Sequence, residues 1–163
     1  MTRSYGILLP VFSLPGGHGI GDFGTTAYDF VNRLSTLSCT YWQILPLNPG
    51  TIENGHSPYF STSAYAINPL YISLDILRND GLLTDKELAE LPDIPTGLID
   101  YERVKTLKMP LLTRAVQQFQ PNDQYHDFCN ENLHWLDDFA LFEVLRNNRK
   151  QLWTYWDNAV RDR

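Results

Sequence analysis

Two short apolar runs on either side of a helical pattern constrain the fold more than any other feature of this sequence. Residues 6–12 and 41–47 are rich in apolar residues and bounded by loop residues, which is typical of buried β-strands. Between them, apolar residues recur at helical spacing, and these residues are Ala27, Phe30, Val31, Leu34 and Leu37. Thr26 and Asp29 form a weak capping box for this helix. A strand, helix and strand in this order predict parallel pairing with a right-handed crossover, and therefore an α/β fold.

After residue 72 the pattern becomes helical. Three helix starts are predicted from cap residues, which are Ser73, Thr84 with Glu87, and Asp100. Gly81 is expected to end the first of these helices, and Pro92 stops the second. Pro110 is expected to kink or divide the third.

The longest predicted helix spans residues 122–147. Its apolar residues recur every three or four positions and are mostly aromatic, namely Phe128, Trp135, Leu136, Phe139, Phe142 and Leu145. Such a stripe is far more often a core face than a ligand site, so we interpret it as core.

Charge is sparse in the first part of the chain. Of 13 basic and 19 acidic residues in the 163, residues 1–72 hold only Arg3, Arg33, Asp22, Asp29 and Glu53. Two interpretations are open: a buried β-rich core, which we favour, or a site for an uncharged polar ligand. The net charge of -6, without a cluster of lysines and arginines, argues against nucleic acid as a partner.

Targeting and redox signals are weak. Cys39 and Cys129 lie far apart without metal-ligand spacing, so we expect buried free thiols. The apolar run at residues 7–9 is too short for a signal peptide or a membrane span. We therefore expect a cytoplasmic protein without a membrane partner.

Residues 19–24 match G-x-G-x-x-G, a pattern of dinucleotide-binding loops. The loop is too long before the first glycine, Asp22 would repel a pyrophosphate, and no acidic residue follows the second strand to hold a ribose. The four histidines and two cysteines also lack metal-ligand spacing. We expect neither a cofactor nor a metal ion.

The order of several motifs is more specific than any single pattern. They are Gly6–Gly16, His18–Gly24, Tyr41–Leu47, Ser57–Tyr59 and Ser63–Leu70. In this order and spacing they closely resemble the amino-terminal region of the amylomaltase (4-alpha-glucanotransferase, or disproportionating enzyme) family. Weaker similarity continues through residues 99–101 and 135–142 to Trp153 and Trp156, so the resemblance covers the whole chain.

The resemblance implies a (β/α)8 TIM barrel of the alpha-amylase clan. Such a barrel needs about 250 residues, so this chain cannot close one. We expect residues 1–72 to form the first βαβ part, with the first two strands and the substrate loops. Residues 73–163 are expected to form a mainly helical insertion that is incomplete at its C-terminus, and the chain is interpreted as an amino-terminal fragment.

The resemblance also implies transfer of a 1,4-alpha-glucan segment to glucose or a maltooligosaccharide, by a retaining double displacement. In the family, the carboxylates that do this come from later strands, so we assign no catalytic residue and expect the chain alone to be inactive. A minimal catalytic pair of Asp22 and Glu53 is a remote alternative. Another is a non-catalytic alpha-glucan-binding or regulatory protein derived from the same fold.

Substrate contacts are implied at Ser57, Tyr59 and Tyr101, with a maltooligosaccharide or alpha-1,4-glucan as partner. Ser57 matches a family position that bonds a glucose hydroxyl, and an aromatic ring such as that of Tyr59 complements a pyranose face. Tyr101 resembles a distal glucan contact, although an exposed tyrosine after a helix cap is the plainer account. Asp22 and Asn68 are expected to hold loop backbone.

One stretch departs from the family pattern. Residues 52–56 read Ile-Glu-Asn-Gly-His where the family commonly has Gly-Tyr-Gly-Asp, so an aromatic residue is lost and the acidic residue is replaced by His56. An outer sugar contact from this stretch is therefore not expected here.

Overall fold

A computed structural model describes residues 3–94, 97–149 and 151–162. The chain divides into two compact units, Met1–Phe119 and Gln120–Arg163, and each is described by itself. The predicted division into residues 1–72 and 73–163 concerns the family barrel and stays a prediction.

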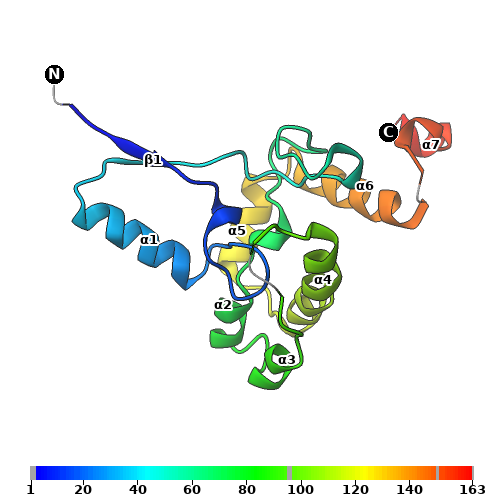
Figure 1. Ribbon diagram of the computed structural model, residues 1–163. Coiled ribbons are helices and arrows are strands. Elements are labelled where there is room, and N and C mark those ends of the chain that lie inside the picture. The colour runs from blue at the N-terminus through cyan, green and yellow to red at the C-terminus, as the bar shows by residue number, and fades with distance from the viewer. Residues whose placement is uncertain (1–2, 95–96, 150, 163) are drawn as a thin grey trace. The chain divides into compact units, whose positions relative to one another are not determined.

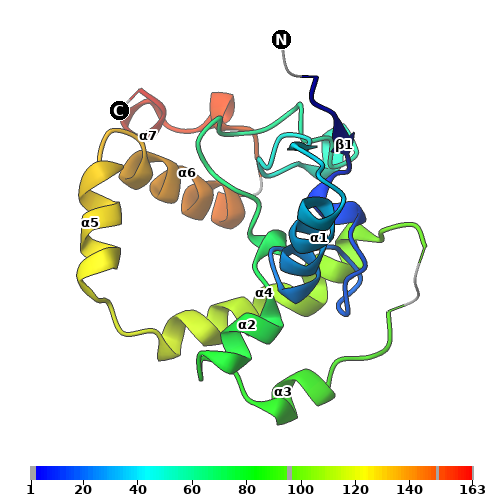
Figure 2. The same ribbon diagram turned by 90° about the vertical axis from the view of Figure 1, so that its left-hand side faces the viewer.

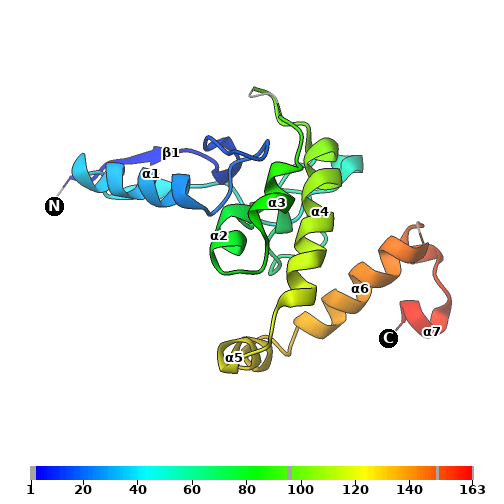
Figure 3. The same cartoon turned by 90° about the horizontal axis from the view of Figure 1, so that it is seen from below.

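The first unit begins with the predicted βαβ element. Strand β1 (Gly6–Leu8) pairs in parallel with β2 (Tyr41–Gln43), with Ile7 opposite Trp42, and helix α1 (Thr25–Thr36) connects them. Figures 1 and 3 show α1 lying along β1. The parallel βαβ prediction is confirmed, and both strands are shorter than predicted.

The prediction of buried strands is wrong, because Leu8 and Tyr41 are 56% and 62% exposed. Within the described residues the sheet has two strands, so each lacks a neighbour on one side. The side chains of a strand are covered only when further elements pack on the sheet.

Helix α1 differs from its prediction at both ends. Gly24 is the N-cap and no side chain caps the helix, so the capping box of Thr26 and Asp29 is wrong. Ala27 and Leu34 are buried as expected, whereas Val31 and Leu37 are exposed.

Three 3-10 helices and three further α-helices are described in the first unit. They are the 3-10 helices η1 (Val11–Ser13), η2 (Ile52–Asn54) and η3 (Pro69–Tyr71) and the α-helices α2 (Leu74–Asn79), α3 (Asp85–Ala89) and α4 (Tyr101–Gln118). The Thr84–Glu87 capping box and the Asp100 cap are confirmed, and Ser73 is an N-cap without a side-chain bond. Helix α4 continues through Pro110, so the predicted division there is wrong.

Helix α4 supplies the buried face on which this unit is built. Val104, Lys108, Leu112 and Ala115 follow one stripe of the helix, and all four are buried. Val104 joins a core cluster with Val11, Leu14, Ile20, Ala27, Leu70 and Tyr71. Leu112 and Ala115 join a second cluster with Leu74 and Leu83, and Figure 2 shows α2 beside α4.

The second unit contains α5 (Asp123–Glu131), α6 (Leu136–Arg149), the 3-10 helix η4 (Trp153–Tyr155) and α7 (Asn158–Arg161). The single helix predicted for residues 122–147 is wrong, because Asn132 ends α5. Its side chain donates to the Phe128 carbonyl at 2.8 Å and accepts from the indole N–H of Trp135 at 2.9 Å. Asparagine side chains compete in this way with continued helix hydrogen bonding.

Burial in the second unit is limited. The aromatic stripe is only half-buried along α6, and Phe128 of α5 is exposed. Trp156 is buried, with its ring 5.6 Å from that of Phe142. The expectation of buried thiols is also wrong, since Cys39 and Cys129 are free but only half-buried. Among the described residues, no helix has the length and apolar character needed to cross a membrane.

Candidate functional site

Two loops leave the same edge of the parallel sheet. They are the first loop (residues 13–24), which follows β1 and η1, and the second loop (residues 48–68), which follows β2. Because parallel strands end at the same edge of a sheet, the loops after β1 and β2 lie at one face. The candidate site lies on this face.

The first loop is buried against the core. Leu14 and Ile20 are almost completely buried, and the Gly21 N–H donates to the Phe12 carbonyl at 3.0 Å. A Cβ on Gly21 would collide with the Val11 carbonyl oxygen, so only glycine fits there. The glycine-rich stretch therefore serves close backbone packing.

Asp22 holds this loop through both oxygens. Its Oδ1 accepts from the Gly24 N–H at 2.9 Å, and its Oδ2 lies 3.5 Å from Nζ of Lys108. The prediction that Asp22 holds loop backbone is confirmed.

Lys108 is a buried cation that joins the first loop to the chain after the second loop. Its side chain is fully buried, and Nζ donates to the carbonyls of Leu70 at 2.7 Å and Ile72 at 2.8 Å. Burial lowers the pKa of Lys108, while Asp22 acts in the opposite direction. Lys108 was not predicted as a functional or structural residue from the sequence. The signal for the burial of Lys108 is its position on the apolar stripe of α4, four residues from both Val104 and Leu112.

The base of the second loop is fixed by two asparagines. The side chain of Asn48 donates to the carbonyls of Ser63 at 3.0 Å and Ala66 at 3.1 Å. Asn68 is buried, its N–H donates to the Leu47 carbonyl, and its Oδ1 accepts from the Leu70 N–H at 3.0 Å. The structural role predicted for Asn68 is confirmed.

Within this loop, residues 50–61 close on themselves, and we call them the Gly50–Ser61 turn. An antiparallel bridge joins Gly50 to Ser61. Gly55 and His56 both have left-handed backbone, with φ of 60° and 57°. For a histidine this conformation costs about 1–2 kcal/mol, so other contacts must hold it.

Those contacts come from the start of α4. The His56 ring stacks on Tyr101, with ring centroids 4.7 Å apart and planes 11° from parallel. Its Nε2 lies 3.1 Å from Oε1 of Glu102. A ring pair contributes about 0.5–1.5 kcal/mol, which is enough to offset much of the backbone cost.

Tyr101 is therefore not the exposed tyrosine of the plainer account. It is half-buried against the first core cluster, its ring packs against His56, and burial raises its pKa. The contact between His56 and Tyr101 could not be predicted from the sequence, because a left-handed histidine has no reliable sequence pattern.

Ser57 and Tyr59 lie together on the turn. The Ser57 Oγ accepts from the backbone N–H of Tyr59 at 3.4 Å, which holds the Ser57 side chain against the Tyr59 backbone. Ser57 is half-buried, whereas Tyr59 is 68% exposed and Phe60 64%. The structure thus groups Ser57 and Tyr59 on one turn, and His56 connects that turn to Tyr101.

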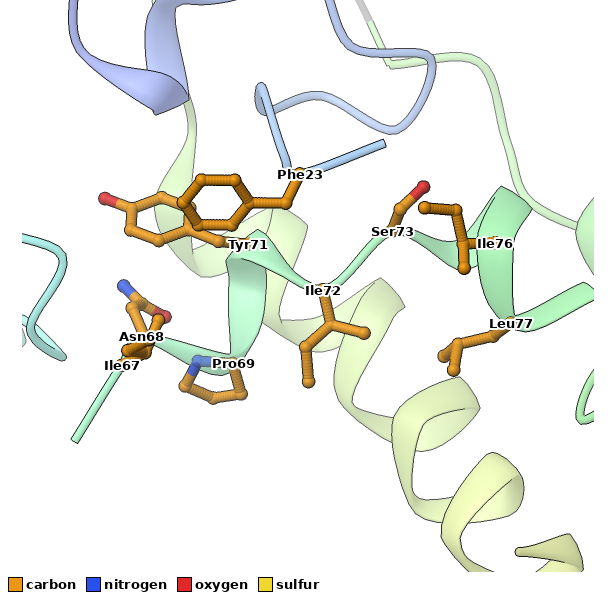
Figure 4. A pocket seen from close by; sticks show the side chains of 9 residues that line it. All are labelled: Phe23, Ile67, Asn68, Pro69, Tyr71, Ile72, Ser73, Ile76 and Leu77. Carbon is orange, nitrogen blue, oxygen red and sulfur yellow. The ribbon is translucent and has the colours of Figure 1, made fainter. Parts of the chain in front are cut away.

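An apolar pocket of about 360 Å³ lies below the second loop (Figure 4). It is lined by Phe23, Ile67, Asn68, Pro69, Tyr71, Ile72, Ser73, Ile76 and Leu77. The Phe23 and Tyr71 rings meet edge to face at 6.3 Å, and burial raises the pKa of Tyr71. With few polar groups, this pocket suits apolar side chains better than a sugar.

No group of three or more histidine, cysteine, aspartate or glutamate side chains in the described ranges is arranged to hold a metal ion.

Comparison with known proteins gives a consistent picture. Residues 9–163 match the family described as 4-alpha-glucanotransferase. The chain is 37% identical over 161 residues to the 4-alpha-glucanotransferase of Aquifex aeolicus, covering 99% of this chain and 33% of that protein. It is 40% identical over 165 residues to that of Streptococcus pneumoniae, covering 96% and 32%.

A solved structure is similar as well. The amylomaltase from Streptococcus agalactiae in complex with acarbose superposes with a TM-score of 0.86 at 33% identity, over 96% of this chain and 32% of that one. The chain spans about a third of the length of the relatives it matches. The predicted resemblance over the whole chain is confirmed.

Proposed function

Because the chain belongs to the 4-alpha-glucanotransferase family, we propose that it binds an alpha-1,4-glucan on the Gly50–Ser61 turn. In the complete reaction, a 1,4-alpha-glucan segment would pass to glucose or a maltooligosaccharide by a retaining double displacement. In this proposal, β1, α1 and β2 are the start of the (β/α)8 barrel, and the helices after residue 72 are its insertion.

Tyr59 is the observation that carries the proposal. Tyr59 is 68% exposed as a residue, although the turn that carries it is closed by backbone hydrogen bonds. A tyrosine held in this way offers a flat apolar face to a pyranose and a hydroxyl to its polar edge. Ser57, bonded to the Tyr59 backbone, would contact a hydroxyl of the neighbouring glucose.

The sparse charge of residues 1–72 suits a neutral polar ligand, although Glu53 lies on the turn and Glu102 contacts it. Residues 1–72 contain two basic and three acidic side chains, and Asp22 is occupied by Gly24 and Lys108. Tyr101 would make the distal contact. Since one face of its ring packs against His56, this contact would use the ring edge or the hydroxyl.

We propose that this chain alone does not cleave the glucan. Retention needs a carboxylate nucleophile and a second carboxylic acid about 5 Å apart. Asp22 is a poor candidate because both of its oxygens are already held. Incubation with maltotriose is expected to release no glucose, and clear release would contradict this part of the proposal.

A titration of the chain with maltoheptaose, followed by NMR, tests binding. With only part of a groove present, we expect a dissociation constant on the order of millimolar. Tyr59→Ala should weaken binding about tenfold. Tyr28→Ala, which removes a tyrosine 65% exposed on α1, is the matched control and should bind as the unmodified chain does. Equal binding by Tyr59→Ala would overturn the proposed site.

The same titration separates the alternative function. Saturation at micromolar concentration would favour a free-standing glucan-binding or regulatory protein, since such a module must bind without the rest of a barrel.

A further inference from the structure

The residues next to His56 in the sequence do not explain its left-handed backbone conformation. His56 stands in left-handed backbone between the exposed residues of η2 and the pair Ser57 and Tyr59. Its own side chain is only 16% exposed, because it packs against the first turn of α4. We propose that His56 is a positioning residue, which holds the Gly50–Ser61 turn in the geometry that presents Ser57 and Tyr59 to a glucan.

Backbone hydrogen bonds within the turn fix its internal shape. The N–H groups of His56, Gly55 and Ser57 donate to the carbonyls of Thr51, Ile52 and Asn54, at 2.8, 2.9 and 3.1 Å. All three bonds lie within the turn. They set how Ser57 lies relative to Thr51, but they do not set how the turn lies relative to α4.

The His56 side chain supplies that second constraint. Tyr101 is packed into the core cluster, so its ring is a fixed surface. The stack at 4.7 Å sets the height of the histidine ring, and the 3.1 Å contact between Nε2 and Glu102 sets its rotation in the ring plane. Ser57 follows His56 directly in the chain, so the position of the His56 ring determines where Ser57 and Tyr59 lie.

The backbone of His56 is also in close contact with Gly50, on the opposite side of the turn. A Cβ on Gly50 would lie 2.6 Å from the His56 carbonyl oxygen, so the backbone of residue 56 rests on residue 50. His56 is thus held by Gly50 through its backbone and by Tyr101 and Glu102 through its ring. Because His56 is held on both sides, the position of α4 determines the position of the turn.

This inference rests on the proposed glucan site, and three variants of the full chain test it. His56→Ala removes the stack and the contact with Glu102, His56→Phe keeps a ring for the stack, and Glu102→Gln replaces the carboxylate with a neutral amide. His126→Ala is the matched control, because its ring also contacts a tyrosine, Tyr125, but in the second unit.

Two readouts are needed. Hydrogen exchange of the backbone N–H groups of Gly55, His56 and Ser57 reports the order of the turn, and titration with maltoheptaose reports presentation of Ser57 and Tyr59. We expect His56→Ala to raise exchange at these amides about fivefold or more, and to weaken maltoheptaose binding by a similar factor. His56→Phe and Glu102→Gln should each lose less than His56→Ala, and His126→Ala should change neither readout.

The melting temperature separates positioning from stability. Because the turn is exposed, His56→Ala should lower it by no more than about 2 °C. The inference is overturned if His56→Ala leaves amide exchange unchanged, or if it loosens the turn while maltoheptaose binding stays within twofold of the unmodified chain.

Failure of the proposed function gives a different result. If the unmodified chain and Tyr59→Ala both fail to bind maltoheptaose, the glucan site is refuted. Amide exchange in His56→Ala then decides alone whether His56 holds the turn.

Discussion

The two loops at one edge of the sheet are held in opposite ways. The first loop is part of the core, with Ile20 almost completely buried and Asp22 bonded to the buried Lys108. The Gly50–Ser61 turn instead closes on itself and leaves Tyr59 and Phe60 mostly exposed. Changes in the first loop should therefore reduce stability, whereas changes in the turn should reduce binding. This contrast separates a loop that packs into the core from a turn whose exposed side chains carry the proposed glucan site.

Lys108→Met should give the largest loss of stability. It leaves the carbonyls of Leu70 and Ile72 and the carboxylate of Asp22 without their buried donor. We expect the free energy of unfolding to fall by about 3–4 kcal/mol, measured by urea unfolding with circular dichroism. Lys105→Met, on the exposed side of the same helix, is the control and should change it by less than about 0.5 kcal/mol.

Gly21→Ala should come next. The added methyl group would collide with backbone atoms of Val11 and Leu14, which cannot rotate away. The expected loss is about 2–3 kcal/mol in the same measurement. Gly17→Ala, four residues earlier in open space, should change little. Equal stability of the two variants would mean that the first loop is not packed as described.

Gly50→Ala tests the other side of the contrast. Its methyl group would press on the His56 backbone at 2.6 Å, but the exposed turn can shift to relieve the contact. We expect a stability loss of only about 1 kcal/mol, together with weaker maltoheptaose binding. A loss as large as that of Gly21→Ala, with binding retained, would remove the distinction between the two loops.

The smallest effect should be a pH dependence carried by Lys108. Burial lowers its pKa in the folded chain, whereas in the unfolded chain a lysine titrates near about 10.4. Between these two pKa values the unfolded chain binds more protons, so the free energy of unfolding rises with pH. The stability difference between the unmodified chain and Lys108→Met should therefore grow as the pH is raised towards 10. A flat or falling difference, compared with Lys105→Met, would contradict this sign.

Local signals in the sequence predicted local structure well. The capping box at Thr84 and Glu87 and the cap at Asp100 are confirmed, whereas the equally local box at Thr26 and Asp29 is wrong, because Gly24 begins α1 two residues earlier. Pro110 failed as a helix breaker, since residues on both sides of it are buried: Val104 packs into the first core cluster and Leu112 into the second. Strand burial could not be predicted from residues 6–12 alone, because it depends on what covers the sheet.

The candidate site divides in the same way. The resemblance located Ser57 and Tyr59 on one loop, and the structure places them side by side. The stack of His56 on Tyr101 joins residues 45 positions apart, and the bonds of Lys108 to Leu70 and Ile72 join elements that only the tertiary fold brings together. Sequence periodicity reports which face of a helix is buried, but it does not report which partner lies there.

The two half-buried cysteines allow the opening of each unit to be followed by thiol labelling. Cys39 lies where the strands meet, with Sγ 3.5 Å from the Tyr41 carbonyl and 3.7 Å from that of Tyr5, and Cys129 lies in the second unit. Since each unit carries one thiol, the rate of thiol labelling followed by mass spectrometry measures the opening of each unit separately, without an engineered label. The rate at which β1 and β2 separate and the rate at which the helices of the second unit unfold can thus be measured in a single sample.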